Sequence, residues 1–290
     1  VIVGMTRDGT TEASRHFPGV IDDVRVTKGV ARYTANFTPP NAEFYDQAAV
    51  ADTFLEKSST AHTVSLIGDA AQTTGSNGKF TEGYIFDGTG DYMTLPASAD
   101  WDLGTGAFTF ETWFLHSTLN LQEHWPLISA GNHTGGGSWF IDIYKFEGTF
   151  QLRLGYHPDQ TQSATYVFQE TISTSVDTWY HIAVVRNGNV FYAFVDGSQV
   201  GNVTQNTIDL PYDSSQEGGL VGALNGYDTL QEASNEFKMD DVRLTKGVAR
   251  YTSNFSVPTV EFETGLPSNS TFPEKSSTGH TVTLVGDAEQ

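Results

Sequence analysis

A long internal repeat constrains the fold of this chain more than any other feature. The segment DDVRVTKGVARYT (22–34) returns almost unchanged as DDVRLTKGVARYT (240–252), a shift of 218 residues. The match continues without a gap to EKSSTAHTVSLIGDA (56–70), whose counterpart is EKSSTGHTVTLVGDA (274–288). A solenoid repeat is much shorter, so this period corresponds to a whole domain with its linker. Two unrelated domains are not expected to match by chance over such a length.

The repeat sets the expected domain boundaries. We predict that residues 1–40 are the C-terminal part of a preceding domain, that 53–258 form one complete domain, and that 271–290 begin a further repeat. Residues 41–52 and 259–270 are the expected linkers, because proline and small polar residues gather in and around them. The sequence therefore predicts a tandem array.

The charge balance and the residue types exclude several classes of partner. The formal net charge is −20 and the pI is about 4.5, so the chain lacks the basic surface that nucleic-acid binding requires. It contains no cysteine, which excludes disulfide-stapled modules and zinc–thiolate sites. No apolar run approaches the length of a membrane-spanning helix, so we expect no membrane insertion.

Short strand patterns alternate with turn signals throughout the complete repeat. GAFTFETWFLH (106–116) is apolar enough that we expect both of its faces to be largely buried. WYHIAVVRNGNVFYAFVDG (179–197) places Asn187–Gly188 between two apolar runs, which is a strong hairpin signal, and ends in a second turn pair. Many short strands in a unit of about 200 residues predict an all-β fold, an antiparallel two-sheet jelly-roll sandwich.

The repeated motif is expected to close this sandwich. Its last strand should send Val242 and Leu244 into the core. Thr245 is predicted to cap a single helical turn in which Val248 and Tyr251 point the same way. The motif would then mark the end of each domain.

Four motifs occur in a characteristic order along the complete repeat. They are YIFDGTGDYMTLP (84–96), DLGTGAFTFETWF (102–114), TWYHIAVVRNGNVFYAFVDGSQVG (178–201) and MDDVRLTKGVARYTSNF (239–255). Together they resemble the laminin G-like, concanavalin A-like lectin/glucanase sandwich domains found in tandem in phage tail-fibre and other virion proteins and in bacterial surface adhesins. The resemblance covers the whole middle unit and implies a concanavalin A-like jelly roll. This fold carries lectins, hydrolases and plain spacers, so it does not by itself give the function.

The resemblance also implies that loop carboxylates can hold calcium, although no cofactor is required. Calcium takes six to eight hard oxygen ligands, which aspartates in glycine-rich loops supply. The candidates are Asp87 and Asp91 in FDGTGDY, and Asp240 and Asp241 in the repeated motif. Structural alternatives stand beside this interpretation. Asp87 can shape a turn with the glycine that follows it, and Asp241 can pair with Arg243 or Arg250.

Sugar sites on this fold use exposed aromatic rings to stack on pyranose faces. The glycine-rich stretch 119–139, which also contains His124, and the short stretches 154–160 and 224–228 offer such residues. The candidates for glycan binding are Trp125, His133, Trp139, Tyr156, His157, Asn225 and Tyr227. For Trp125 and Trp139 the competing interpretation is that they begin strands and belong to the core.

No catalytic signature is present, so we predict that the protein is not an enzyme and name no catalytic residue. No glutamate is followed two residues later by aspartate, as the laminarinase-type Glu-x-Asp-x-Glu pattern requires, and Glu111 stands alone on its strand. His-Glu-x-x-His, Gly-x-Ser-x-Gly and phosphate-binding glycine loops are also absent from the sequence.

We therefore expect a structural and adhesive module of a bacteriophage virion, in a tail fibre or appendage. Its expected partners are host-surface carbohydrate or other virion proteins, with a spacer role as a variant of the same idea and a homotrimer as the expected oligomer. The alternative is a secreted or cell-surface lectin-like adhesin. A glycoside hydrolase is a distant third.

Overall fold

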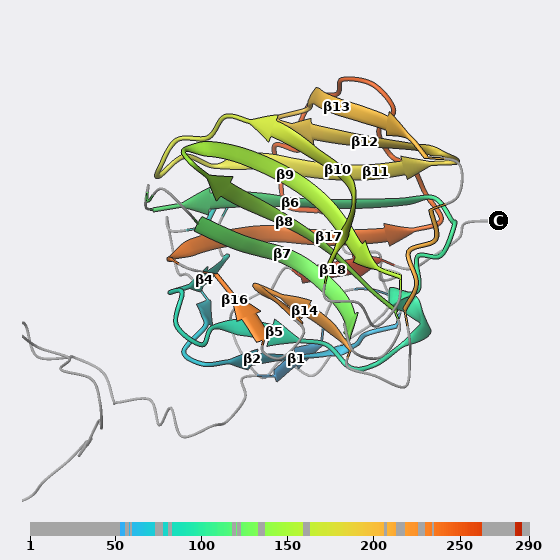
Figure 1. Ribbon diagram of the computed structural model, residues 1–290. Coiled ribbons are helices and arrows are strands. Elements are labelled where there is room, and N and C mark those ends of the chain that lie inside the picture. Colours follow the sequence, from blue (N-terminus) through green and yellow to red (C-terminus); the bar gives the residue numbers. More distant parts are fainter. Residues whose placement is uncertain are drawn as a thin grey trace, which may run out of the picture. The chain divides into compact units, whose positions relative to one another are not determined.

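The described strands of this protein form a β-sandwich (Figure 1). The computed structural model describes residues 53–55, 58, 60–72, 78–80, 83–117, 120, 123–132, 137–158, 163–205, 208–212, 218–225, 230–233, 235–262 and 282–285. The chain divides into two compact units, Val1–Val50 and Ala51–Gln290, and all described residues belong to the second. The predicted fragment of a preceding domain and its linker therefore lie outside the described residues.

The first sheet contains eight strands. In spatial order they are β1 (Thr53–Leu55), β2 (Thr63–Ile67), β5 (Tyr92–Thr94), β14 (Gly219–Val221), β7 (Glu123–Asn132), β8 (Gly137–Phe146), β9 (Thr149–His157) and β10 (Thr165–Ile172). Each neighbouring pair is antiparallel. Strands β7 to β10 follow one another along the chain as a meander of hairpins.

The second sheet brings together strands from distant parts of the sequence. In spatial order they are β13 (Ser198–Thr204), β12 (Val190–Val195), β11 (Tyr180–Asn187), β6 (Phe108–His116), β17 (Phe237–Lys246), β4 (Tyr84–Phe86) and β3 (Ala71–Gln72). These pairs are antiparallel as well, whereas β18 (Val282–Val285) joins β17 in parallel. A small ladder of β15 (Ala223–Asn225) and β16 (Leu230–Glu232) and a 3-10 turn at Ala99–Trp101 complete the described elements.

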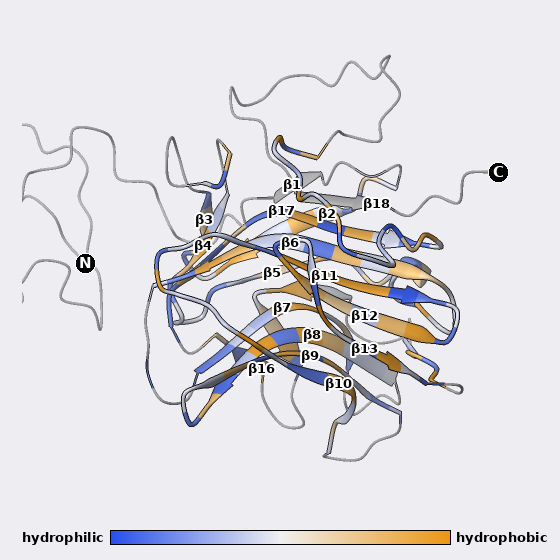
Figure 2. Ribbon diagram, turned by 90° about the horizontal axis from the view of Figure 1, so that it is seen from above, coloured by the Kyte–Doolittle hydropathy of each residue, from blue (hydrophilic) through white to orange (hydrophobic). Residues whose placement is uncertain are grey.

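The two sheets face each other across one hydrophobic core, and they appear as two layers in Figure 2. Alternation within the strands produces this core, because successive side chains point to opposite faces of a sheet. Phe108, Phe110 and Phe114 of β6 are fully buried in it. The predicted antiparallel sandwich is confirmed.

The predicted hairpin is present, with its turn one residue further along. Strands β11 and β12 pair as far as Asn187 opposite Val190, so the turn consists of Gly188 and Asn189. Gly188 adopts a positive φ of 59°, a conformation that favours glycine. Gly188, which the sequence pattern assigned to the turn, is thus a turn residue in the structure.

The repeated motif differs from its prediction at one point. Val242 and Leu244 enter the core as expected, but β17 runs on to Lys246 and no helical turn follows it in the described part of the chain. Val248 is 37% exposed, whereas Tyr251 packs on the outer face of the second sheet. Gly247 lies inside the predicted turn and has a φ of +86°, which a right-handed helical turn does not allow.

Candidate functional site

The two candidate tryptophans belong to the core. Trp125 of β7 and Trp139 of β8 are both 0% exposed. The Trp139 indole donates to the carbonyl of Trp101 at 2.7 Å, and the Trp125 ring stacks on Phe150. Neither ring presents a face to solvent, so neither can stack on a sugar in this fold. The alternative interpretation of the sequence, that both tryptophans belong to the core, matches their position.

The outer face of the first sheet carries an aromatic and charged surface instead. Along β8, Ile141 and Ile143 point into the core, and the alternate residues, including Tyr144, point outward. Arg153 of β9 lies with its guanidinium carbon 4.1 Å from the centre of the Tyr144 ring and 5.1 Å from that of Tyr166 on β10. Both tyrosines are only half-buried. One planar cation is thus flanked by two partly exposed rings, an arrangement with cation–π character.

A buried carboxylate fixes this arginine in place. Asp142 lies opposite Arg153 in the ladder and accepts a bond from its Nε at 2.9 Å. His124 of β7 lies 2.7 Å from the same carboxylate. Burial alone would raise the pKa of Asp142, but the bonds from His124 and Arg153 outweigh burial and hold that pKa below its usual range. We call Tyr144, Arg153, Tyr166, Asp142 and His124 the tyrosine–arginine cluster.

Aromatic rings extend the cluster along both strands. Phe146, 45% exposed, stacks on Tyr144 with ring centres 6.3 Å apart. Phe140 meets Tyr166 edge to face and lies directly over Gly155, where a Cβ atom would come within 2.3 Å of the ring. The glycine at this position therefore makes room for the Phe140 ring on the sheet.

One of the sequence candidates, His157, borders this surface. His157 is buried, with its Nδ1 3.0 Å from the hydroxyl of Ser138 and its ring against Phe140. Tyr156 is half-buried and packs against the core. Asn225 donates to the carbonyl of Gly131 at 3.1 Å and so joins the β15 segment to β7. His133 and Tyr227 lie outside the described residues.

The tyrosine–arginine cluster was not predicted, although a signal for it exists. In FIDIYKF (140–146) and QLRLGYH (151–157), aliphatic residues at every second position mark the buried face. The residues between them, Tyr144 and Arg153 among them, are then the outward ones. Their neighbourhood depends on the register of β8 against β9, which no single segment reveals.

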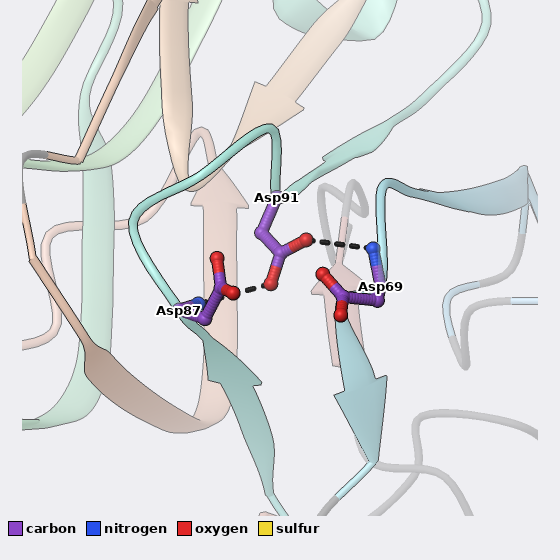
Figure 3. Close-up of side chains that lie close together, drawn as sticks. All are labelled: Asp69, Asp87 and Asp91. Atoms are coloured by element: carbon purple, nitrogen blue, oxygen red, sulfur yellow. Dashed lines mark hydrogen bonds between the residues drawn. The ribbon is translucent and has the colours of Figure 1, made fainter. Parts of the chain in front are cut away.

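The loop aspartates form a second candidate site (Figure 3). Asp69 after β2, Asp87 after β4 and Asp91 before β5 each bring a carboxylate oxygen within 4.8 Å of the others. Asp91 is buried and accepts bonds from the backbone N–H groups of Asp69 at 2.8 Å and Asp87 at 2.9 Å. Burial raises the pKa of Asp91 to about 6, and the neighbouring negative charges of Asp87 and Asp69 add to the rise. Asp69 is the member that the sequence did not indicate.

Three carboxylates in such proximity suit a hard divalent cation. Calcium binds oxygen ligands, and its charge would relieve the mutual repulsion of the three groups. The expected turn at Asp87 is also present, because its side chain accepts from the backbone N–H of Thr89 at 2.7 Å. Asp87 thus shapes the turn and also places its carboxylate in the group.

The other aspartate pair does not join this group. Asp240 accepts bonds from the backbone N–H groups of Lys79 and Asp241, at 2.8 Å in each case. Asp241 accepts from the N–H of Phe262 at 2.9 Å. The two arginines that the sequence suggested as partners of Asp241 lie beside Glu111 instead. Arg243 donates to Glu111 at 2.6 Å, and Arg250 lies 3.8 Å from the same carboxylate.

Comparison with solved structures finds matches of low sequence identity. The carbohydrate binding module CBM66 from Bacillus subtilis matches with a TM-score of 0.39 and 11% identity, over 66% of this chain and 96% of its own. Domain 4 of AbnA, an extracellular arabinanase from Geobacillus stearothermophilus, solved with arabinotriose, matches with a TM-score of 0.40 and 14% identity, over 64% and 92%. Tailspike protein 2 of Escherichia coli O157:H7 bacteriophage CAB120 matches with a TM-score of 0.47 and 11% identity, over 70% of this chain and 27% of the tailspike.

These likenesses concern the fold alone. No curated protein sequence matches the chain. In the part of the chain that the structure describes, no helix has the length and apolar character needed to cross a membrane. A laminin G family model, described as the concanavalin A-like lectin/glucanases superfamily, matches residues 87–249. Because this match covers more than half of the chain and the strands form the corresponding sandwich, the chain belongs to the concanavalin A-like lectin/glucanase superfamily.

Proposed function

We propose that this domain is a non-catalytic carbohydrate-binding module and that the tyrosine–arginine cluster is its binding surface. The observation that carries the proposal is the pair of half-buried rings, Tyr144 and Tyr166, on either side of Arg153. Aromatic side chains combine an apolar face with a polar group and therefore suit the mixed surface of a sugar. Membership in a lectin-like superfamily makes a sugar the natural ligand class.

The ligand that fits this surface best is a neutral glycan. The charge of Arg153 is already matched by Asp142, which receives bonds from both Arg153 and His124. An arginine that is only 8% exposed has little capacity left to bind a sugar carboxylate. The net charge of −20 would in addition repel an acidic polysaccharide.

Two buried strand carboxylates, Glu111 and Asp142, support binding without catalysis. Glycoside hydrolysis needs one carboxylic acid and one carboxylate that reach the scissile bond. Glu111 is 0% exposed and its oxygens accept bonds from Arg243 and Tyr251. Asp142 is equally buried and equally engaged. Neither side chain can reach a substrate.

Substitution of the two rings tests the binding surface. We expect Tyr144→Ala and Tyr166→Ala each to lower the affinity for a neutral glycan found on an array by about five- to thirtyfold, a loss of roughly 1–2 kcal/mol of stacking. Tyr192→Ala is the matched control, because Tyr192 stacks on Phe194 on the outer face of the other sheet. Equal affinity of all three variants and the wild type would overturn the proposed surface.

We further propose that the domain is one unit of a tandem array in a phage tail fibre or appendage, in contact with host-surface carbohydrate or other virion proteins. The internal repeat and the resemblance of the four motifs support this role. A secreted or cell-surface adhesin is the second candidate. A trimeric coiled coil or a baseplate-attachment segment in the neighbouring sequence would favour the virion, and a signal peptide with a wall anchor would favour the adhesin.

The aspartate group of Figure 3 supports a calcium-binding proposal beside the glycan surface. Calcium held by Asp69, Asp87 and Asp91 would tie the ends of β2, β4 and β5 together. We expect millimolar calcium to raise the melting temperature, because a ligand that binds only the folded state stabilises it by mass action. Asp87→Asn should remove that increase. Melting curves that coincide in calcium and in chelator would contradict the proposal.

A further inference from the structure

The chain does not leave the sandwich when β17 ends. Residues 247–262, which we call the exit segment, continue over the outer face of the second sheet. Tyr251 and Phe255 stack on each other with ring centres 3.6 Å apart, and both pack on a small cluster around Phe194. The Tyr251 hydroxyl donates to Glu111 at 2.9 Å. The exit segment is thus attached to the sheet both by apolar contact and by a bond to a buried charge.

The turn between β12 and β13 holds the middle of the exit segment. The backbone N–H of Phe255 donates to the carbonyl of Gly197 at 2.9 Å. One residue earlier, the side-chain oxygen of Asn254 accepts from the N–H of Gln199 at 2.9 Å. Two strands far from β17 in the sheet therefore take part in the attachment.

A separate contact fixes the far end of the segment. The backbone N–H of Phe262 donates to Asp241, and the guanidinium carbon of Arg243 lies 3.5 Å from the centre of the Phe262 ring. Phe262 is only 6% exposed, whereas Val260, two residues earlier, is 68% exposed. The chain thus returns to the sheet at Phe262, beyond the predicted domain end at residue 258.

The residues of this contact recur in the first copy of the repeat. The shift of 218 residues places Asp23, Arg25 and Phe44 at the positions of Asp241, Arg243 and Phe262. Tyr33 and Phe37 correspond in the same way to Tyr251 and Phe255. The spacing of 21 residues between the aspartate and the phenylalanine is therefore the same in both copies.

We propose that the outer face of the second sheet is a docking surface for the chain's own exit segment, and that the contact between Asp241 and Phe262 fastens this segment to the domain. The proline-containing stretch before Phe262 then belongs to this domain. The tyrosine–arginine cluster lies on the other sheet, so this role is independent of ligand binding.

Hydrogen exchange of the full chain tests the docking. We expect Asp241→Ala and Phe262→Ala to speed exchange of the backbone amide of residue 262 by about tenfold or more, because this amide loses either its acceptor or the ring contact that holds it in place. Exchange in β6 and β11 should stay unchanged, which distinguishes release of the segment from unfolding. Val260→Ala is the matched control, since that exposed side chain lies in the same segment.

Asp241→Asn keeps an acceptor oxygen for the Phe262 amide, so this variant should retain slow exchange. Unchanged exchange of the residue 262 amide in Asp241→Ala, or an equal rise in Val260→Ala, would overturn the docking.

Discussion

Glu111 shows how a single buried residue organises one end of the domain. Its carboxylate accepts bonds from Arg243 at 2.6 Å and Tyr251 at 2.9 Å, and His181 lies 3.3 Å away. Burial alone would raise the pKa of Glu111, but His181 and Arg243 outweigh burial and hold that pKa below its usual range. Arg243 and Tyr251 of the repeated motif thus share one structural partner.

Asp241 gives a prediction about pH at the same scale. Burial raises its pKa to about 7, and the negative charges of Asp240 and Glu261 add to the rise while Arg243 opposes it. The folded protein then holds a proton that the unfolded chain releases near pH 4, so the free energy of unfolding should fall as pH rises from about 4 to 7. Asp241→Asn should remove up to about 4 kcal/mol of this dependence.

Urea unfolding of the wild type and of Asp241→Asn at a series of pH values measures the difference. Asp102→Asn, a change at an exposed carboxyl, serves as the control. Asp102→Asn should keep the pH profile of the wild type. If Asp241→Asn keeps it as well, Asp241 does not carry a proton in the folded state.

At the scale of elements, the turn between β12 and β13 has two structural roles: it closes a hairpin and contacts the exit segment. Asp196 and Gly197 both have positive φ angles, 48° and 71°, as a tight hairpin turn with the twist of the strands requires. A Cβ atom on Gly197 would lie 2.1 Å from the carbonyl oxygen of Phe255 in the exit segment. The glycine therefore serves the turn and also allows the close approach of another part of the chain.

Two glycine substitutions separate these effects. Gly188, in the neighbouring hairpin, has a φ of +59° with no atom within 4 Å of an added Cβ, so Gly188→Ala should cost only the backbone strain of about 1–2 kcal/mol. Gly197→Ala should cost more, because the exit segment must also move. Thermal and urea unfolding of the two variants measure the difference. Equal losses of stability would mean that the exit segment does not press on the turn.

At the scale of the whole molecule, the two outer faces of the sandwich differ in what covers them. The exit segment packs on the second sheet, while half-buried tyrosines and Phe146 lie on the outer face of the first. The net charge of −20 belongs to a chain in which the charges of the proposed binding surface are paired. Recognition through stacking should then be insensitive to salt.

Ionic strength provides the corresponding test. The affinity for a neutral glycan should change by less than about twofold between 50 and 500 mM NaCl, because screening acts on unpaired charges. A glycan that carries uronic or sialic acids should bind weakly at low salt. Tight binding of an acidic glycan that weakens steeply with salt would show that unpaired cations recognise the ligand. Isothermal titration at the two salt concentrations gives both values.

The sequence predicted the sandwich because alternation and turn chemistry are local. The apolar run of β6 and the glycine turn after Asn187 can be recognised without knowing their neighbours. The aspartate group and the tyrosine–arginine cluster depend on the pairing of distant segments. Asp69 precedes Asp91 by 22 residues and meets it only because β2 pairs with β5. Register between strands is a property of the assembled sheet. The sequence alone therefore could not show that Asp69 joins the aspartate group or that Tyr144 lies beside Arg153.

One irregularity in β17 has a further consequence. Its ladder with β6 passes from Asp240 opposite Trp113 to Arg243 opposite Glu111, so β17 contains one residue more than its partner needs. Met239 and Val242 both reach the core across this bulge, and the strand would keep its phase without Asp241. A gene that lost this codon would still encode a regular strand. The alternation of β17 is enough to fold the sandwich. The extra residue, Asp241, instead holds the chain that follows β17.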